Sequence, residues 1–555
     1  MRKLSKATLA LATELEEHAA QQHFDALPPL LAALGASGEP AALAVLLPYL
    51  LASPPSTALA ARQAAGALLA TTPQAELGWL EQEIRSRSRR DAYYYRQPPA
   101  GAASEWRGLT AAALKRHARE PGGAALLQVA SFHDSGFVRE AAIYAMDADQ
   151  SGDELPYLLL RLNDWVPVIH HAARGAIERR LEPDYAQHFL TSIALCQRLA
   201  EQRRNALGPL HEKIQALLRS PAAAPARLQA EGSPDRHVRR AAFLLSAESP
   251  STDDAALREL LLRALGSGDL WVRIWATRTA RTRLYGPALR ETLGQARGDR
   301  SVPVRREALL GFVEEFPELR RSLLDPCASL REMVRYYLRK KANLDFAAIY
   351  RQELERLKDA EEQPAAPRAT TQLITALAGL GESGGEEDAD RVELFTIDDR
   401  PRVQQAALTA LGRLAGERSR PTLAAALGSP YASVCRAALA ALGPHLPLVG
   451  AEALWRAYSE QPSGRCRFYL VKALGQLPRW VGTRYLLAAC GDPEPGAADE
   501  ALRLTRLWLA APNYVAPAPE EKAALEALLP TLPRVQGEPA LRSRLEWTLA
   551  PWRQS

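Results

Sequence analysis

The chain of 555 residues has few of the residues that build disulfide frameworks or metal centres. It contains 5 cysteines and 10 histidines. The number of cysteines is odd, no two form a CxxC pair, and none lies in a Cys/His cluster at metal-ligand spacing. We therefore expect free thiols, a reducing compartment and residence in the cytoplasm. The cysteines are Cys196, Cys327, Cys435, Cys466 and Cys490.

Long apolar runs are also missing. No stretch approaches the roughly 18 consecutive apolar residues that a membrane span needs, so we expect no membrane partner. The basic N-terminus is followed by an apolar run from Ala7 to Ala12, which Glu14 soon ends. That run is shorter than the roughly 7 to 15 apolar residues of a signal peptide, so we do not expect secretion.

Motifs of common enzymes are largely absent. The chain has no Gly-Lys dipeptide, which excludes a Walker A loop, and no HExxH metal motif. Gly381 to Gly385 spells GESGG and matches the GxSxG nucleophile motif, but a helical pattern precedes it where that motif requires a strand. We interpret it as a turn between repeats. His170 and His171 lie on a helical pattern, with His171 on its packing side, and lack metal-ligand partners at helical spacing. We expect no enzymatic activity, no cofactor and no metal.

Overall charge gives no clear sign of a nucleic-acid partner. The formal net charge is +5, charged residues make up 24% of the chain, and aromatic residues only 6%. Of 69 basic residues, 9 are Lys and the other 60 are Arg. A net charge this small over so long a chain does not by itself indicate nucleic-acid binding, so the local distribution of arginine decides.

What the chain does contain is a repeated phrase, clearest in DDRPRVQQAALTALGRL at 398–414. A polar turn with a proline is followed by apolar residues at i, i+3, i+4, i+7, i+8 and i+11, which predicts a helix with one apolar side. These residues are Val403, Ala406, Ala407, Ala410, Leu411 and Leu414.

The phrase returns about every 26 to 34 residues, a period typical of helical repeat arrays, except between 168 and 238 and between 330 and 403, where less regular units fill the interval. Each first apolar residue, which we name the anchor, follows a polar turn whose Asp, Ser or Pro can begin a helix. Between anchors there is room for one more short helix, so each unit is an αα-hairpin and the hairpins stack. The predicted anchors are Val138, Val168, Val238, Val272, Val304, Leu330, Val403, Val434 and Cys466.

The pattern D-x-x-x-V-R followed by A-A-x-x-A-L resembles the second helix of HEAT repeats, in particular the short HEAT-like units of bacterial proteins. The resemblance covers about four fifths of the chain and implies an all-α superhelix, a solenoid of roughly sixteen hairpins, with the second helices on its inner face. It also implies a tendency to bind proteins and carries no reaction. We expect N-terminal units at 1–83, an inserted loop at 84–108, central repeats at 109–345, and C-terminal repeats with a cap at 346–555.

Arginine follows the anchor in many units, and two interpretations stay open for it. Such an arginine can pair with the capping Asp of the adjacent unit and form a ladder, which we favour for any single one. More arginines lie off the apolar side between 238 and 341 than one Asp per unit can pair. We predict that this basic surface binds an acidic partner, through Arg240, Arg278, Arg306, Arg335 and Arg339.

The segment 84–108 departs from the repeat rhythm, because Arg, Tyr, Pro and Gly replace the apolar side. We interpret it as an extended loop. Basic residues interleaved with aromatic ones can hold phosphates and stack bases, and the same mixture is enriched at protein interfaces. The segment is our second candidate surface, with Arg87, Arg89, Arg90, Tyr94, Tyr95, Arg96 and Trp106.

Two functions of different class follow from these features. The favoured one is a non-enzymatic scaffold or adaptor that binds a partner protein on its concave face, because a long array presents a large preformed surface. The alternative is a nucleic-acid-binding solenoid that resembles the HEAT-like alkylpurine DNA glycosylases, although no catalytic Asp and aromatic pair can be matched to that family. The sequence leaves the oligomeric state open.

Overall fold

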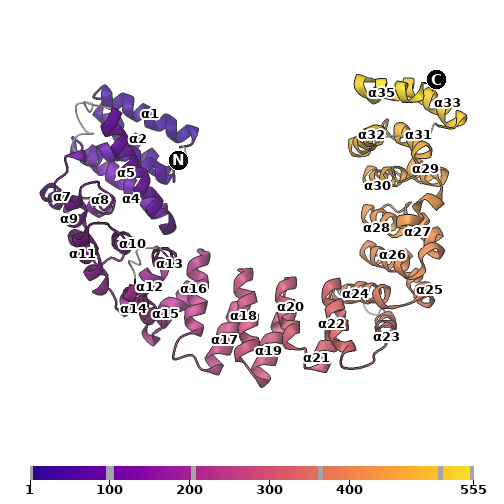
Figure 1. Cartoon of the computed structure of the whole chain (residues 1–555), viewed down its shortest axis with the longest axis horizontal. Helices are drawn as coiled ribbons and strands as arrows, with labels where there is room; N and C mark the ends of the chain where they lie inside the picture. Colours follow the sequence, from indigo (N-terminus) through magenta and orange to yellow (C-terminus); the bar gives the residue numbers. More distant parts are fainter. Residues whose placement is uncertain (1–3, 95–105, 202–207, 360–366, 511–516, 551–555) are drawn as a thin grey trace. The chain divides into compact units, whose positions relative to one another are not determined.

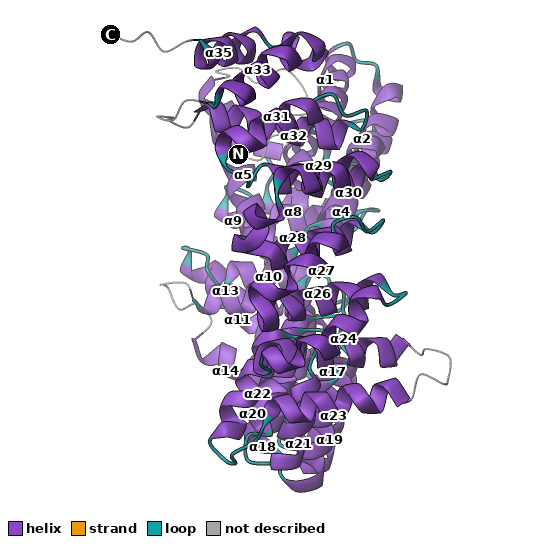
Figure 2. Cartoon of the chain, turned by 90° about the vertical axis from the view of Figure 1, so that its right-hand side faces the viewer, coloured by secondary structure: helices purple, strands orange, loops and turns teal. Residues whose placement is uncertain are grey.

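The computed structural model describes residues 4–94, 106–201, 208–359, 367–510 and 517–550 (Figure 1). Every regular element in these ranges is a helix, and Figure 2 shows helices joined by loops, with no strand in the described part. The chain divides into two compact units, Met1–Ala296 and Arg297–Ser555. Each unit is described by itself.

The first unit contains α-helices and short 3-10 helices. Its α-helices are α1 Lys6–Ala20, α2 Leu27–Ala36, α3 Leu43–Leu46, α4 Pro55–Thr71, α5 Leu77–Tyr94, α7 Ala111–His117, α8 Gly123–Ala130, α9 Gly136–Asp147, α10 Leu155–Arg161, α11 Pro167–Glu178, α12 Ala186–Thr191, α13 Ile193–Ala200, α14 Gly208–Arg219, α15 Ala224–Ala230, α16 Arg236–Ala247, α17 Asp254–Leu265, α18 Leu270–Arg283 and α19 Gly286–Arg297. Its 3-10 helices are η1 Phe24–Ala26, η2 Pro40–Ala42, η3 Leu47–Tyr49, η4 Gln74–Glu76, η5 Pro183–Tyr185 and η6 Pro221–Ala223.

The second unit has the same composition of elements. Its α-helices are α20 Val302–Gly311, α21 Phe316–Arg321, α22 Ala328–Arg339, α23 Phe346–Asp359, α24 Pro367–Ser383, α25 Ala389–Glu393, α26 Pro401–Ala415, α27 Arg420–Ala426, α28 Ala432–Leu442, α29 Ala451–Glu460, α30 Gly464–Leu474, α31 Arg479–Ala489, α32 Pro495–Ala510, α33 Pro519–Leu528, α34 Pro533–Gln536 and α35 Pro539–Leu549. Its 3-10 helices are η7 Ser322–Leu324, η9 Glu386–Asp388, η10 Leu394–Ile397, η11 Gly416–Ser419, η12 Gly443–Val449 and η13 Leu529–Thr531.

Consecutive helices form hairpins, and the hairpins stack within each unit. In the second unit α27 packs on α28, α29 on α30 and α31 on α32, while the second helices α24, α26, α28, α30 and α32 each contact the next (Figure 1). In the first unit α8 packs on α9, α10 on α11, and α9 on α11. The predicted all-α solenoid of stacked helical hairpins is therefore confirmed. The count of sixteen stays a prediction, because 3-10 helices replace parts of several first helices.

Burial confirms the repeat register at eight of the nine predicted anchors, all except Val168. These eight are at most 5% exposed. Each of these anchors is the third residue of its α-helix. The prediction is wrong for Val168, which is 53% exposed, whereas Ile169 is 1% exposed. Because α11 begins at Pro167, its third residue is Ile169. The same shift turns His171 outward, so its predicted place on the packing side is also wrong.

The predicted loop at 84–108 is wrong in its first part, because α5 continues to Tyr94. Leu77, Leu80 and Ile84 are buried at helical spacing, and Arg85 forms an ion pair with Glu81 one turn earlier. Arg has a high helix propensity and Ser a moderate one, so α5 continues through these residues although the apolar pattern ends. Residues 95–105 lie outside the described residues.

One window, Ala432–Val449, is long and apolar enough to cross a membrane by length and composition, with a mean hydropathy of 1.3. It joins α28 to η12 across Gly443, whose φ of +43° breaks the α-helix. Pro447 interrupts the second half. Val434, Leu442 and Leu446 belong to the core of the second unit. The window is thus a repeat helix and its following turn.

Glycine lets second helices approach closely where α24 meets α26. A Cβ on Gly381 would lie 2.6 Å from both Cα and Cβ of Ala410. We expect Gly381→Ala to lower the free energy of unfolding by about 1–3 kcal/mol through overpacking, although alanine favours a helix by about 1 kcal/mol. Gly294→Ala in α19 is the control, because open space surrounds its Cβ position. Thermal unfolding of both variants checks this, and equal midpoints would contradict it.

Candidate functional site

The arginine that follows the anchor forms the predicted ladder with an acidic residue of the next hairpin. Two nitrogens of the guanidinium group contact two oxygens of one carboxylate, at 2.8 to 3.0 Å in three hairpin pairs. This bidentate geometry is the strong form of an Arg–carboxylate pair. The pairs are Arg139 with Asp164, Arg305 with Asp325 and Arg467 with Asp492.

The same arginines also hold the turn of their own hairpin. In Arg139, the Nη1 nitrogen donates to the backbone carbonyls of His133 and Asp134, both at 2.9 Å. Arg305 and Arg467 repeat this with the carbonyls five and six residues before them. Each ladder arginine therefore fixes both the turn before its helix and the spacing to the next hairpin.

Two of the five arginines predicted to bind a partner form ion pairs within the protein. Arg240 makes a bidentate pair with Asp269, at 2.8 and 3.1 Å, and its guanidinium lies 5.2 Å from the ring centroid of Trp271. Arg335 is 7% exposed and donates to Glu382 at 2.9 Å. The expectation that Arg335 projects onto the surface is wrong, because α22 turns it toward α24.

The other three predicted arginines, Arg278, Arg306 and Arg339, are exposed. Arg278 belongs to the first unit, and Arg306 and Arg339 to the second. Arg339 lies with its guanidinium 5.6 Å from the ring centroid of Phe346. Binding of an acidic partner by this set stays a prediction.

The ladder makes the first unit sensitive to acid through Asp269. Hydrogen bonds from Arg240 and from the backbone N–H of Trp271 outweigh burial and lower the pKa of Asp269 from 3.8 to about 2. Because the folded pKa lies below the ordinary value, the unfolded chain takes up the proton first as the pH falls. The stabilisation is therefore complete above about pH 4 and is lost as the pH falls toward about 2.

We expect Asp269→Asn to destabilise the protein at pH 7 and to flatten the fall of its stability between about pH 4 and pH 2. Asparagine keeps the shape and the helix-capping oxygen but has no charge to titrate. Urea unfolding over that pH range, followed by circular dichroism, measures the effect. Parallel pH profiles for the wild type and the variant would contradict the role of this carboxylate.

The second predicted surface is only partly described. Residues 95–105 contain Tyr95 and Arg96 and lie outside the described residues, and the side chains of Arg87, Arg89, Arg90 and Tyr94 also lie outside them. Trp106 is 4% exposed, packs against His133 with ring centroids 5.0 Å apart, and accepts a 2.9 Å contact from His133 Nε2 at its carbonyl. Its predicted place on a binding surface is wrong, because the indole completes the core beside α9.

Sequence reasoning missed four exposed apolar side chains that lie on α9, on α11 and in the turn before α11, in the first unit. We name them the apolar cluster: Phe137 is 78% exposed, Trp165 69%, Tyr144 54% and Val168 53%. The two helices pack on each other, and the Cβ position of Gly136 lies 3.7 Å from Ile169 Cδ1. Phe137 and Val168 are both the second residue of their helices, next to the buried anchor. Placing the start of α11 one residue later, at Pro167, would have revealed that Val168 is exposed.

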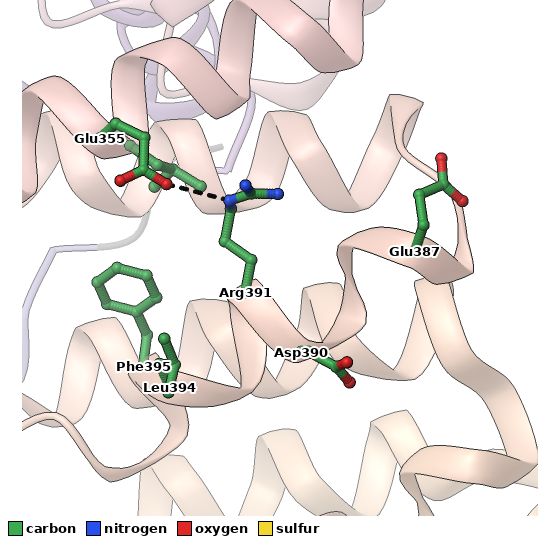
Figure 3. Close-up of a pocket in the computed structure, with 7 residues that line it drawn as sticks. Glu355, Glu387, Asp390, Arg391, Leu394 and Phe395 are labelled. Atoms are coloured by element: carbon green, nitrogen blue, oxygen red, sulfur yellow. Dashed lines mark hydrogen bonds and ion pairs between the residues drawn. The ribbon is translucent and has the colours of Figure 1, made fainter.

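A pocket of about 510 Å³ in the second unit lies between α23 and α25 (Figure 3). Arg391 points to Glu355 across it, at 3.2 Å, while Glu387 and Asp390 lie away from that pair. Glu387 pairs with Arg351 at 3.3 Å, and Asp390 pairs with Arg418 at 2.6 Å. Each of these carboxylates is thus paired with its own arginine.

The candidate nucleophile and metal ligands have structural roles. Ser383 lies in the last turn of α24, and its hydroxyl donates to the carbonyl of Gly379 at 2.8 Å. His170 and His171 each direct Nδ1 at a backbone carbonyl, at 2.5 and 2.6 Å. Among the described residues no group of three or more His, Cys, Asp or Glu could hold a metal ion.

The stacked hairpins and the Arg/Asp ladder define the protein as an α–α solenoid of helical hairpins. Comparison with family models and with curated proteins found no match. Among solved structures the chain is similar to importin beta in an ammonium sulfate condition, with a TM-score of 0.30 and 12% identity over 98% of this chain and 78% of that one.

Two further solved structures are similar at the same level. The karyopherin Kap121p bound to the extreme C-terminus of the protein phosphatase Cdc14p has a TM-score of 0.27 and 12% identity, over 91% of this chain and 53% of that chain. The C-terminal fragment of the cohesin loader SCC2 of Chaetomium thermophilum has a TM-score of 0.25 and 12% identity, over 98% of this chain and 56% of that one. The chain thus spans about half the length of these two.

Proposed function

We propose that this protein is a non-enzymatic solenoid scaffold that binds a partner protein. The apolar cluster carries the proposal. Single exposed apolar residues are normal, but exposed apolar area gathered on neighbouring elements marks an interaction site, and these four residues belong to two helices that pack on each other and to the turn before α11. Aromatic residues are enriched in the cores of protein interfaces, and Trp and Tyr dominate binding hot spots.

The way these side chains are held also supports binding. Phe137 and Val168 each precede a buried anchor, and the helix of Phe137 is fixed by the buried pair of Arg139 with Asp164. A rigid backbone presents its side chains at little further entropic cost on binding. The apolar cluster is therefore a preformed binding surface on two second helices.

We also propose that the partner carries acidic groups and that the protein works in the cytoplasm, as the sequence predicts. The exposed Arg278, Arg306 and Arg339 support the acidic partner. They would speed association by electrostatic steering, while the apolar cluster would supply most of the affinity.

Affinity capture tests the proposal. The tagged full chain is incubated with lysate of the organism that encodes it, with and without nuclease, and captured proteins are identified by mass spectrometry. We expect one protein captured in both conditions, whose purified form binds the purified chain with defined stoichiometry. Capture that disappears with nuclease, together with direct binding of DNA or RNA whose affinity falls steeply with salt, would replace it with the nucleic-acid alternative.

A further inference from the structure

The strongest unexplained feature of the second unit is an excess of arginine around one buried carboxylate. Glu382, whose side chain is 10% exposed, accepts hydrogen bonds from Arg331 and Arg335, whose side chains are 3% and 8% exposed. The Nη1 nitrogen of Arg413 lies 3.8 Å from the same carboxylate. Three guanidinium groups therefore surround a single negative charge.

The charges of this cluster are fixed. Burial alone would raise the pKa of Glu382, but hydrogen bonds from Arg331 and the charges of both buried arginines lower it, so the carboxylate stays ionised. Arginine is effectively always protonated in proteins. Arg331 and Arg335 have their remaining contacts with neutral groups, the carbonyl of Asp325 at 2.7 Å and the hydroxyl of Tyr350 at 3.5 Å. The cluster thus keeps a positive charge that Glu382 does not neutralise.

A cleft of about 540 Å³ opens beside this cluster, between the end of α22, the start of α23 and the end of α24. Its lining includes Glu382, Asn343, Gly384 and the exposed Arg339, one helical turn after Arg335. Asp345 also lines it, but this carboxylate caps α23 through the N–H of Ala348 at 3.0 Å. It also faces Arg351 at 3.8 Å, but Asp388 and Glu387 already pair with that arginine. Asp345 therefore adds a second negative charge beside that of Glu382, against the four positive charges of Arg331, Arg335, Arg339 and Arg413.

We propose that this cleft binds an oxyanion, a carboxylate or phosphate group, on an acidic segment of the partner protein. A second anion would balance the excess positive charge of the cluster by pairing with its exposed arginines, and a planar guanidinium group binds carboxylate and phosphate through two parallel hydrogen bonds. Arg339 lines the cleft, and the exposed Arg413 lies 3.8 Å from Glu382 in that lining, so these two arginines supply the accessible donors. Arg331 and Arg335 hold Glu382 in place from the buried side. The cleft volume suits one or two side chains of a peptide.

The proposal rests on the proposed function, because the anion reaches the cleft as part of a partner protein. It concerns a different unit from the apolar cluster, so each can fail without the other. Peptide binding tests the cleft, and substitutions in the apolar cluster test the scaffold role.

The test uses three fluorescein-labelled peptides of equal length, rich in glutamate, phosphoserine or glutamine, and the full-length protein. Fluorescence anisotropy at low salt measures their affinities. We expect binding of the glutamate or the phosphoserine peptide, the tighter of the two giving the natural source of the anion, and at least about tenfold weaker binding of the glutamine peptide.

The decisive variant is Arg339→Gln with Arg413→Gln, two exposed positions whose replacement leaves the buried pairs intact. The matched control is Arg503→Gln with Arg506→Gln on α32, where the side chains are 52% and 53% exposed, as Arg413 is 53% exposed. We expect the cleft variant to bind the acidic peptide at least about tenfold more weakly and the control to bind it as the wild type does. Equal weakening in both variants, or no binding of either acidic peptide by the wild type, would overturn the proposal.

Discussion

Arg139→Ala is expected to lower the local free energy of unfolding of α9 and α11 by about 3–5 kcal/mol, the usual cost of removing one partner from a buried ion pair. The side chains of Arg139 and Asp164 are 1% and 0% exposed, so the substitution would leave a carboxylate in the interior. Arg161, at 2.9 Å from the same carboxylate, compensates only part of that loss. The carbonyls of His133 and Asp134 would lose their donor as well.

Hydrogen exchange of the backbone amides in α9 and α11 measures this effect, because long repeat arrays open in parts and a single global midpoint would hide it. Arg239→Ala is the control. Its side chain is 21% exposed, and Arg240 continues to pair with Asp269 after the substitution, so we expect a loss of at most about 1 kcal/mol. Equal protection losses in the two variants would show that the ladder does not fix the hairpin spacing.

Phe137→Ala with Trp165→Ala is expected to weaken the complex with the captured partner at least about 30-fold. Truncation of a hot-spot residue costs about 2 kcal/mol or more, and every 1.4 kcal/mol is tenfold in affinity. Both side chains are more than two-thirds exposed, so the stability of the free protein should change by no more than about 0.5 kcal/mol. Titration calorimetry with the purified partner measures the affinity.

The matched control for this double variant is Leu228→Ala with Tyr285→Ala. These side chains are 58% and 77% exposed in the same unit but lie on α15 and before α19. We expect the control to bind the partner within about twofold of the wild type. Comparable losses in both double variants would remove the apolar cluster from the account of binding.

The fold could be predicted because a repeated local pattern determines it. Third-position anchors such as Val272 and Val403 are buried completely, and capping by Asp269 places the start of α18 where the sequence predicts it. The ladder was also open to prediction, since an Arg after the anchor and an Asp before the next one recur together. Both features depend on contacts between sequence neighbours or adjacent hairpins.

The sites were harder to predict, because they depend on which helix face each residue takes. A one-residue error at Val168 rotated the predicted packing side of α11 by about 100° and hid the exposure of Val168. The sequence predicts an exposed Arg335, but its side chain is buried and forms an ion pair with Glu382, which lies far from it in sequence. No periodic pattern links these two residues, since the packing of α22 on α24 brings them together.

The central claim is that a partner protein docks on the second helices through the apolar cluster. Hydrogen exchange of the free chain and of its purified complex with the captured partner tests this most directly. The account predicts new protection in α9 and α11, centred on the turns that carry Phe137 and Trp165, with no loss of protection elsewhere in the first unit. Protection that is confined to other helices and leaves α9 and α11 unchanged would contradict it.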